Sequence, residues 1–432
     1  MKISYYNIGC KVNFAEISEI QKRLEEKGHS TVSFGEQTDA VIINTCTVTN
    51  HADSDARKII RRALRLSPEA FVGVLGCYAQ LKPDEIAQIE GVDAVFGIKD
   101  KFAVVDYIDS ISRKHKPEIF VSDLKDLPFH TATSEDNESR TRIFMKLQDG
   151  CDYPCTYCTI PAARGGSRSM DFDELKSRFI QLNNAEQYEI ILSGVNLGEY
   201  MAPTGENFTD VIRFLDEAGL KQRIRISSIE PNLIKPELLK IIKNSKTICP
   251  HLHIPLQSGS PEILALMKRR YNADFFRDQI LMIKQQIPHL SIGVDVISGF
   301  PGETDRHFSE TLDLLKSLPI SYIHAFTYSE RSGTPAESMP GKVASDTRKS
   351  RTMELRKLSE TKKREFFESQ TGIVLSVIPE DYNPETGHWA GWTENYVRVE
   401  FPAESDIEIK PYKIKLLKML EDTVLGERLQ KV

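Results

Sequence analysis

The sequence predicts an α/β protein in three parts: an open parallel α/β sheet, a partial (β/α)6 barrel and a small all-β domain. Three observations lead to this prediction. Short apolar runs alternate with helical patterns over residues 1–127 and again over 140–370, which is typical of βαβ units. A polar stretch without periodicity separates these regions, and beyond residue 371 the helical patterns stop. The 432 residues are enough for three separate cores.

The first domain, residues 1–127, is expected to be an open parallel sheet with helices between its strands. The apolar runs that fit strands are 3–8, 40–44, 71–76 and 93–97. The segments with apolar residues at helical spacing are 16–27, 54–66 and 83–89. The segment 127–140 is polar and rich in Ser and Thr, so we expect a linker there.

The second domain, residues 140–370, contains six strand candidates with a helical pattern in each gap, which favours a partial barrel over a flat sheet. They are 143–147, 189–192, 223–227, 251–256, 292–297 and 322–327. A long charged helix is expected at 342–370. The third domain, residues 371–432, reads as a small OB-like β domain. Its strand candidates are 373–378, 396–401 and 407–416.

The composition is that of a folded protein, with 40% hydrophobic and 27% charged residues, which excludes extensive disorder. The chain has no apolar run near the roughly 18 residues of a membrane span, and its first six residues lack a signal-peptide pattern. We therefore expect a cytoplasmic protein with no membrane contact. A net charge of −6 argues against nucleic-acid binding over the whole surface but is compatible with a local basic patch.

Three cysteines lie within eight residues directly after the predicted strand 143–147: Cys151, Cys155 and Cys158. Loops at the carboxyl ends of strands are where α/β proteins build active sites. Three thiolates can hold three irons of a [4Fe–4S] cluster and leave the fourth iron open. The alternatives are a zinc site or unrelated core cysteines. Zinc normally needs a fourth ligand, and no other Cys or His lies within ten residues on either side.

This motif resembles the signature of the radical S-adenosylmethionine (SAM) enzymes, CxxxCxxC with an aromatic residue before the last cysteine. The resemblance implies that SAM binds the open iron through its amino and carboxylate groups and is reduced to a 5'-deoxyadenosyl radical. It further implies that SAM contacts lie in this loop and near the ends of later strands. The candidates are Tyr157, Ser193, Gly194, Ser228, Gln257, Asp295, Gly299 and Pro301.

A second set of cysteines, Cys10, Cys46 and Cys77, is scattered in sequence, yet each follows one of the first three predicted strands by one or two residues. The carboxyl ends of parallel strands share one edge of a sheet, so we expect these thiols to converge on a second cluster. Buried free cysteines in an α/β core are the alternative. Cys249 precedes a strand, and we expect it to be structural.

The segments GCKVN at 9–13 and NTCTV at 44–48, with CxxxCxYC and the three-domain order, resemble the radical SAM methylthiotransferases over essentially the whole chain. The resemblance implies an auxiliary [4Fe–4S] cluster on the first cysteine set, the SAM cluster in the barrel and a substrate-binding TRAM domain at 371–432. The radical takes hydrogen from carbon 2 of an adenine, sulfur is delivered at the auxiliary cluster, and a second SAM donates the methyl group. An electron donor such as flavodoxin or ferredoxin and a monomeric state are also expected.

The family divides by substrate: isopentenyladenosine in tRNA, threonylcarbamoyladenosine in tRNA, or an aspartate of ribosomal protein S12. The segment 9–13 resembles the threonylcarbamoyladenosine branch, because the other two typically read GCQMN and GCPKN. Glu230 agrees, since the isopentenyl branch usually has His there. The expected substrate is therefore a tRNA anticodon stem-loop with threonylcarbamoyladenosine at position 37. The other two substrates, and a non-catalytic iron–sulfur RNA-binding protein, remain alternatives.

A threonylcarbamoyl group carries a carboxylate and a hydroxyl, so its pocket needs cationic and hydrogen-bonding groups. The candidate substrate-binding residues are Lys11, Asn13, Glu230 and Arg331. Three basic stretches could contact RNA or be ordinary solvated surface: 57–65, 268–271 and 342–370. Trp389, Trp392 and Tyr396 could stack on bases or form the core of the third domain.

Overall fold

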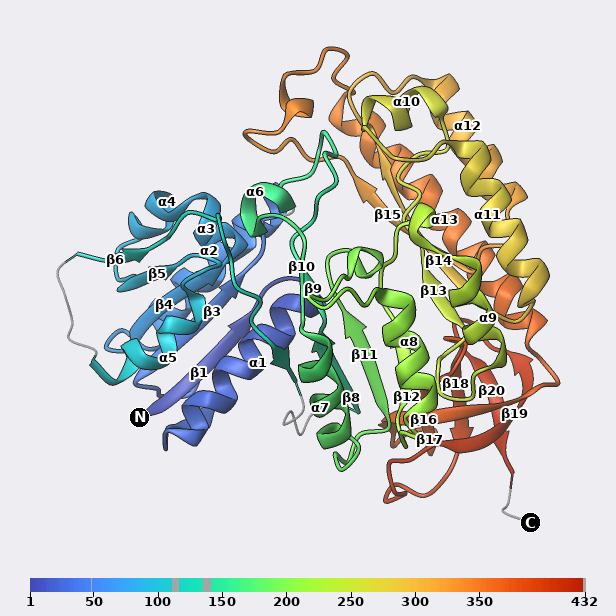
Figure 1. Cartoon of the computed structure of the whole chain (residues 1–432), viewed down its shortest axis with the longest axis horizontal. Helices are drawn as coiled ribbons and strands as arrows, with labels where there is room; N and C mark the ends of the chain where they lie inside the picture. The colour runs from blue at the N-terminus through green and yellow to red at the C-terminus, as the bar shows by residue number, and fades with distance from the viewer. Residues whose placement is uncertain (48, 111–115, 135–140, 430–432) are drawn as a thin grey trace.

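The computed structural model describes residues 1–47, 49–110, 116–134 and 141–429. It shows three units in the expected order: an α/β sheet domain, a central partial barrel and a closed C-terminal β-barrel (Figure 1). Residues 135–140 of the predicted linker and 430–432 of the third domain lie outside the described residues. Among the helices that are described, none combines the length and the apolar composition that a bilayer crossing requires.

The first domain is a fully parallel six-stranded sheet in the order β2-β1-β3-β4-β5-β6. Its strands are β1 (Lys2–Asn7), β2 (Ser30–Val32), β3 (Ala40–Thr45), β4 (Phe71–Gly76), β5 (Ala94–Phe96) and β6 (Glu118–Phe120). Its helices are α1 (Lys11–Glu26), α2 (Asn50–Leu66), α3 (Cys77–Leu81), α4 (Pro83–Ala87) and α5 (Val104–Tyr107). Every residue of β3 and β4 is buried, because helices cover both faces of the sheet.

The central domain has six parallel strands in sequence order, which confirms the predicted partial barrel. They are β8 (Arg142–Lys146), β11 (Glu189–Ser193), β12 (Arg223–Ile226), β13 (His251–His253), β14 (Ser291–Ser298) and β15 (Tyr322–Thr327). Single parallel bridges join β12 and its following loop to the β13 region. The outer helices are α7 (Phe172–Leu182), α8 (Phe208–Glu217), α9 (Pro236–Asn244), α10 (Pro261–Leu266), α11 (Ala273–Gln286), α12 (Asp305–Ser317) and α13 (Ser345–Ser369).

The linker prediction for 127–140 is wrong in part. Strand β7 (Ala132–Thr133) lies inside that segment and pairs antiparallel with β8. Both of its residues are buried, and Ala132 packs in one cluster with Ala15 of α1 and Phe144 of β8. A strand of two residues in a Ser/Thr-rich stretch is too short to show any periodicity.

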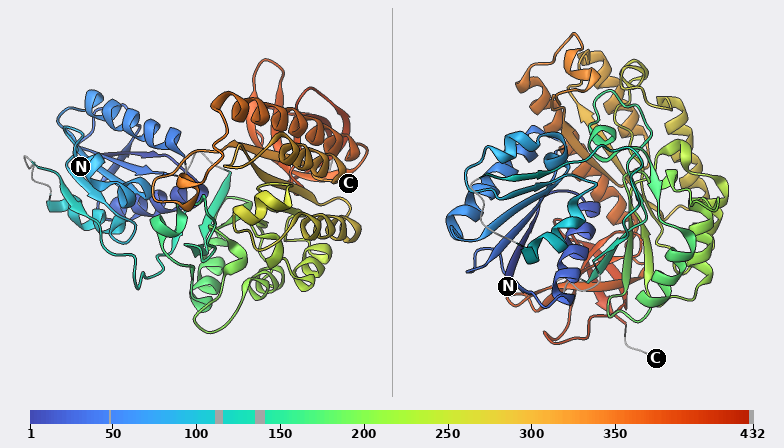
Figure 2. Two further views of the ribbon diagram at one scale, coloured as in Figure 1. Left: turned by 90° about the horizontal axis from the view of Figure 1, so that it is seen from above. Right: turned by 60° about the vertical axis from the view of Figure 1, so that its left-hand side comes forward.

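Helix α1 of the first domain packs on the inner face of the partial barrel. Phe14 meets Phe144 of β8 edge to face, with ring centroids 5.5 Å apart. Ile191 of β11 belongs to the same cluster, whereas its neighbours Ile190 and Leu192 pack against the outer helices. Side chains alternate across a strand, so α1 lies on the concave side of β8 and β11. Figure 2 shows the sheet domain against this open side of the barrel.

The C-terminal domain is a closed five-stranded barrel in the order β16-β17-β18-β20-β19. Its strands are β16 (Val374–Asn383), β17 (His388–Thr393), β18 (Arg398–Pro402), β19 (Tyr412–Met419) and β20 (Val424–Arg428). It packs under the amino end of β12, where Arg223 donates to the carbonyls of Ser376 (3.0 Å) and Trp392 (2.9 Å). Trp389 is buried in the core of this barrel, whereas Trp392 stacks on Tyr396 with centroids 4.4 Å apart and is only partly buried.

Candidate functional site

The loop that carries Cys151, Cys155 and Cys158 leaves β9 (Gln148–Asp149) and ends at α6 (Ile160–Arg164). At its base Gly150 has φ +71°, and a Cβ there would lie 2.0 Å from the carbonyl oxygen of Gly166. The loop folds back so that Cys158 N donates to Cys155 O (3.1 Å). Backbone N–H groups also point at two of the sulfurs: Tyr153 N at Cys151 and Ile160 N at Cys158.

These thiols suit a metal cluster by their chemistry as well as their spacing. Burial raises the pKa of Cys158 to about 12 and raises the pKa of Cys155. Without a cation the three groups are neutral thiols, and a bound iron cluster would supply the positive charge that holds them as thiolates. Their role as ligands remains a prediction from the motif.

A buried arginine contacts one of these sulfurs. Arg269 Nη1 donates to Cys155 Sγ at 3.1 Å, and its other nitrogens contact Glu230 and the Tyr271 hydroxyl. Its side chain is 2% exposed. Arg269 is therefore neither an RNA contact nor ordinary solvated surface, the two interpretations that the sequence left open for 268–271. Glu230 is the ion-pair partner of this arginine, and substrate binding by Glu230 stays a prediction.

The second set of cysteines lies at one edge of the N-terminal sheet. Cys10 caps α1, Cys46 follows β3, and Cys77 begins α3 directly after β4. A Cβ built on Gly9 would lie 3.0 Å from the Cβ of Cys46. Cys10 and Cys77 are near enough to interact electrostatically: burial chiefly raises the pKa of Cys77, and Cys10 raises it further. The strand ends thus bring the three thiols into one region.

Asn13, a predicted substrate residue, is buried among these cysteines. Its amide nitrogen donates to Thr45 O at 3.0 Å and to Ile8 O at 3.3 Å. Its amide oxygen accepts from Cys10 Sγ at 3.6 Å. These bonds tie the loop before α1 to the end of β3. Asn13 therefore supports the arrangement of the cysteines, and direct contact with substrate stays a prediction.

Lys11 is a cation beside Cys10 that has no ion pair with a carboxylate among the described residues. Its side chain is exposed, yet burial by the surrounding protein, with the charges of Arg225 and Arg142, lowers its pKa to about 8. It therefore lies in a hollow that water can reach, where the positive charge of Arg225 and Arg142 is offset in part by Glu189 and Cys10. Such a position suits an anionic group of a ligand.

A cavity of about 220 Å³ adjoins the first cysteine set. Tyr157, Gln257 and Asp295 line it together with Cys158, and Thr49 of the first domain contributes to its wall. The remaining predicted SAM residues do not line this cavity; they are Ser193, Gly194, Ser228, Gly299 and Pro301. All eight SAM contacts stay predictions.

Two of those residues have structural reasons to be glycine. A Cβ on Gly194 would lie 2.8 Å from Leu197 Cδ2 and 3.0 Å from Gln148 Oε1. Gly299 has φ +80°, and a Cβ there would lie 2.2 Å from Arg348 Cγ. Close packing at the strand ends explains both positions without a ligand.

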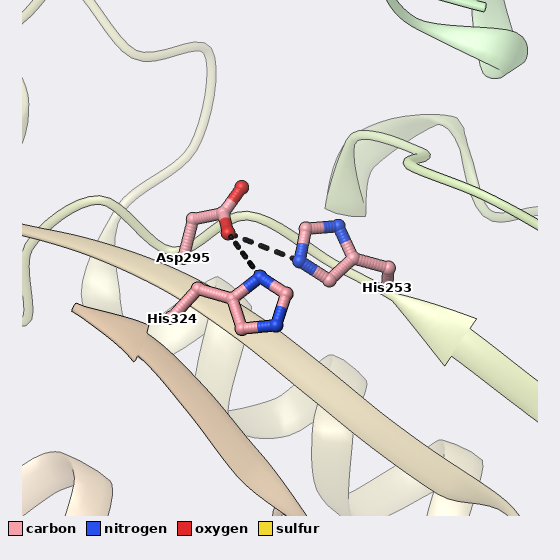
Figure 3. A group of neighbouring side chains, drawn as sticks. All are labelled: His253, Asp295 and His324. Atoms are coloured by element: carbon pink, nitrogen blue, oxygen red, sulfur yellow. Dashed lines mark ion pairs between the residues drawn. The ribbon is translucent and has the colours of Figure 1, made fainter. Parts of the chain in front are cut away.

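Asp295 meets two histidines at the edge of the cavity (Figure 3). His253 Nε2 lies 3.0 Å and His324 Nδ1 lies 3.5 Å from the same Asp295 oxygen. Although burial acts to raise it, these imidazoles hold the pKa of Asp295 well below its usual range. An ionised carboxylate at a cavity wall can accept hydrogen bonds from ligand hydroxyl or amino groups. The sequence reasoning missed both histidines, which the pairing of β13, β14 and β15 brings together.

Arg331, the last predicted substrate residue, is buried in a contact between domains. It donates to Asp53 Oδ2 at 2.8 Å and to the Thr47 hydroxyl. Both partners belong to the first domain, so Arg331 ties that domain to the loop after β15. A substrate contact by Arg331 stays a prediction.

Much of the charge that the sequence places on α13 also points inward. Arg348 and Arg351 are buried and pair with Glu330 and Glu303. Lys362 is buried as well and donates to the carbonyls of two residues near the end of α12. The basic surface available to RNA is therefore smaller than the residue count over 342–370 predicts.

Comparison with known proteins agrees with this geometry. Residues 2–97 match the uncharacterized protein family UPF0004, and residues 145–315 match the radical SAM superfamily. The chain resembles the radical SAM methyltransferase TsrM of Kitasatospora setae with a TM-score of 0.56 at 14% identity, covering 78% of this chain and 75% of that one. That likeness concerns the fold.

Sequence relatives are more specific. The threonylcarbamoyladenosine tRNA methylthiotransferase MtaB of Bacillus subtilis is 39% identical over 96% of this chain and 94% of its own. This chain belongs to the radical SAM methylthiotransferases. The Aquifex aeolicus protein of the same name is 33% identical over 93% of this methylthiotransferase and 96% of its own length. A tRNA-2-methylthio-N(6)-dimethylallyladenosine synthase of Methylobacillus flagellatus is 28% identical over 99% and 98%.

Membership of this family confirms that the methylthiotransferase is a radical SAM transferase. It also confirms, for the family, the predicted cofactors: [4Fe–4S] clusters, two in number, and SAM. Family membership does not identify the residues that hold these cofactors in this chain, so they have to be inferred from the geometry of the site. The sequence reasoning missed Arg164, at the end of α6, which donates to Cys77 Sγ at 3.2 Å, because nothing in its local sequence marks it as buried.

Proposed function

We propose that this methylthiotransferase converts N6-threonylcarbamoyladenosine at tRNA position 37 into its 2-methylthio derivative. The observation that carries the proposal is the pair of three-cysteine sets, one beside a cavity and the other beside Lys11, a cation with no carboxylate partner among the described residues. The relatives at 39% and 33% identity that carry this activity in their names support the substrate.

Cys151, Cys155 and Cys158 would hold a [4Fe–4S] cluster that would supply the electron for the reductive cleavage of SAM, and Cys10, Cys46 and Cys77 would hold a second cluster that would supply a sulfur site. The side chains around the two cysteine sets bind SAM and shield the reaction from water. Gln257 and Asp295 take part in holding SAM at the cavity wall. The packing of α1 on the barrel shields the buried Cys77 side of the N-terminal cysteine set from water, while Cys10 and Lys11 stay exposed; such shielding protects a primary carbon radical.

The substrate assignment depends on charge. A threonylcarbamoyl group brings a carboxylate to the hollow beside Cys10, where Lys11 is available and where Arg142 and Arg225 add positive potential. An isopentenyl group is apolar and would leave that lysine without a partner. The charge of the hollow therefore favours the threonylcarbamoyl substrate over the isopentenyl one.

The remaining assignments follow from this function. Residues 1–127 carry the auxiliary cluster, residues 140–370 form the radical SAM core, and residues 371–432 form the TRAM domain. The partner is the tRNA anticodon stem-loop, and a flavodoxin or ferredoxin supplies electrons. The enzyme acts as a monomer in the cytoplasm.

The test uses the full chain reconstituted with iron and sulfide, SAM and a reductant. Three substrates are compared: threonylcarbamoyl tRNA, isopentenyl tRNA and ribosomal protein S12. Mass spectrometry of the digested products should show 2-methylthio product from the first alone. Methylthiolation of either other substrate without the first would refute the proposal.

A cysteine pair makes the test specific. Cys46→Ala should abolish methylthiolation and keep the formation of 5'-deoxyadenosine from SAM. Cys249→Ala should keep both, because Cys249 belongs to neither set: it is buried just before β13, where its backbone N–H donates to Ile224 O of β12. Failure of the wild-type chain to produce any 5'-deoxyadenosine would instead support a non-catalytic iron–sulfur protein.

A further inference from the structure

Helix α6 physically connects the two cysteine sets. It begins two residues after Cys158, and Ile160 N at its start points at Cys158 Sγ over 3.4 Å. At its other end, Arg164 Nε donates to Cys77 Sγ over 3.2 Å. One short helix therefore contacts a sulfur of each set.

The guanidinium of Arg164 is fully buried and uses all five of its N–H donors. Besides Cys77, it donates to both carboxylate oxygens of Glu16 (3.2 and 3.1 Å) and to Asp149 (2.8 Å). Its last bond goes to the Asn13 oxygen at 2.6 Å, and this oxygen also accepts from Cys10 Sγ. Arg164 is thus fixed in place and reaches two of the three cysteines in the N-terminal set.

The network around Arg164 carries an excess of positive charge. Its carboxylates are Glu16 and Asp149, and its cations are Lys101, Lys146, Arg164 and Arg168. Four cations therefore share two carboxylates. All except Arg168 are nearly inaccessible to solvent, so water and salt screen their field weakly.

The charge of the arginine that contacts a sulfur of the central set is balanced in a different way. Arg269, on Cys155, forms an ion pair with the single carboxylate of Glu230. The N-terminal cysteine set thus lies beside excess positive charge, and the set in the central domain lies beside the Arg269–Glu230 pair and the Glu199 carboxylate near Cys151.

We propose that Arg164 is a positioning residue that raises the reduction potential of the auxiliary cluster and fixes that cluster relative to the SAM site. The inference rests on the proposed function, in which Cys10, Cys46 and Cys77 hold the auxiliary cluster. Reduction by one electron adds one negative charge to a cluster. A hydrogen bond and a cation on Cys77 stabilise this reduced form more than the oxidised form, so they make reduction easier.

The experiment is a redox titration of the full chain carrying both clusters, followed by electron paramagnetic resonance. Arg164→Gln should move the midpoint potential of the auxiliary cluster to more negative values and leave that of the SAM cluster in place. Arg164→Lys keeps the positive charge, so its auxiliary-cluster midpoint potential should lie between those of Arg164→Gln and the wild type. Arg168→Gln is the matched control, because Arg168 also binds Asp149 (2.7 Å) but touches no sulfur.

Loss of Arg164 leaves the carboxylates of Glu16 and Asp149 with fewer partners, so the single variant could fail to fold. In that case the double variant Arg164→Gln/Glu16→Gln, which removes one charge of each sign, is used for the same redox titration. An auxiliary potential that moves no more than in Arg168→Gln overturns the inference. A variant that folds and takes up no auxiliary iron also overturns it, because Arg164 would then act in assembly. Iron analysis separates failure of this inference from failure of the proposed function. Wild-type protein with about four rather than about eight irons per chain would refute the auxiliary cluster itself.

Discussion

The Arg269 guanidinium holds a buried carboxylate and a cysteine sulfur at once, so its loss should affect stability and the SAM cluster together. Arg269→Gln leaves Glu230 buried without its cation, and we expect the free energy of unfolding to fall by about 3 kcal/mol. Denaturant titration measures this.

Arg270→Gln is the control for Arg269, since Arg270 is exposed, donates to the carbonyl of Asp152 and lies over the Tyr153 ring at 4.0 Å, with no carboxylate partner among the described residues. Its effect should stay within about 1 kcal/mol. The double variant Arg269→Gln/Glu230→Gln should recover part of the loss. Equal stability of Arg269→Gln and Arg270→Gln would contradict the prediction.

Gly299 offers a second test at the residue scale. Gly299→Ala combines a positive φ with a Cβ 2.2 Å from Arg348 Cγ, so we expect a loss above about 2 kcal/mol. Gly219→Ala has the same backbone problem, φ +64°, and open space around it, and should cost about 1 kcal/mol. Thermal unfolding compares the two, and an equal loss would mean that the contact with Arg348 relaxes.

Individual residues differ in how far the sequence predicts them. The cysteines could be found because thiol spacing, and position after a strand, are visible in the chain. Arg164, Arg269 and His324 could not, because what each contacts depends on the packing of segments far apart in sequence. A lysine or arginine in a charged run looks the same whether it faces water or a buried carboxylate.

Among the elements, helix α1 is constrained by two domains at once, since it belongs to the first domain and packs on the inner face of the second. Ala15 is fully buried where α1 meets β8. Ala15→Leu overfills this contact at a cost of about 1–3 kcal/mol and should push the cysteine sets apart. We expect 5'-deoxyadenosine formation to persist while the methylthio product falls by about tenfold or more.

Glu26→Leu, at the exposed end of α1, is the control for Ala15→Leu and should leave both products unchanged. Parallel loss of both products in Ala15→Leu would show that the variant is unfolded rather than displaced, and circular dichroism would report this directly.

The longest elements were predicted, and most of the strands that were missed are short. The three-residue strands β5 and β13 were nevertheless predicted, whereas β17 and β20 of the third domain, with six and five residues, were missed. The helix expected at 342–370 is α13, and the six central strands occur where the apolar runs are. Strands β2, β6 and β7 have three residues or fewer, which is less than two repeats of the strand period. Their existence depends on neighbours that the sequence does not reveal.

For the whole molecule, the junction between the central and C-terminal barrels is a candidate RNA contact. Trp392 lines a pocket of about 310 Å³ there together with Arg142 and Tyr396. Trp392→Ala should weaken tRNA binding by about 1–3 kcal/mol, the value of one stacked base, and leave SAM cleavage without tRNA unchanged. Filter binding measures the Kd. Trp389→Phe, in the barrel core, should leave the Kd unchanged, and an unaltered Kd in Trp392→Ala would exclude stacking on this ring.

The contacts of Arg164 and Arg331 limit the routes by which a nucleotide can reach the space between the cysteine sets. Both arginines are buried and fasten the first domain to the rim of the barrel, so the two domains are held together at these two points of the rim. Lys11 remains open to water, close enough to Arg142 to feel its charge. We therefore expect the modified base to enter from the side of the C-terminal barrel. That barrel would then form the entrance to the site as well as bind the tRNA.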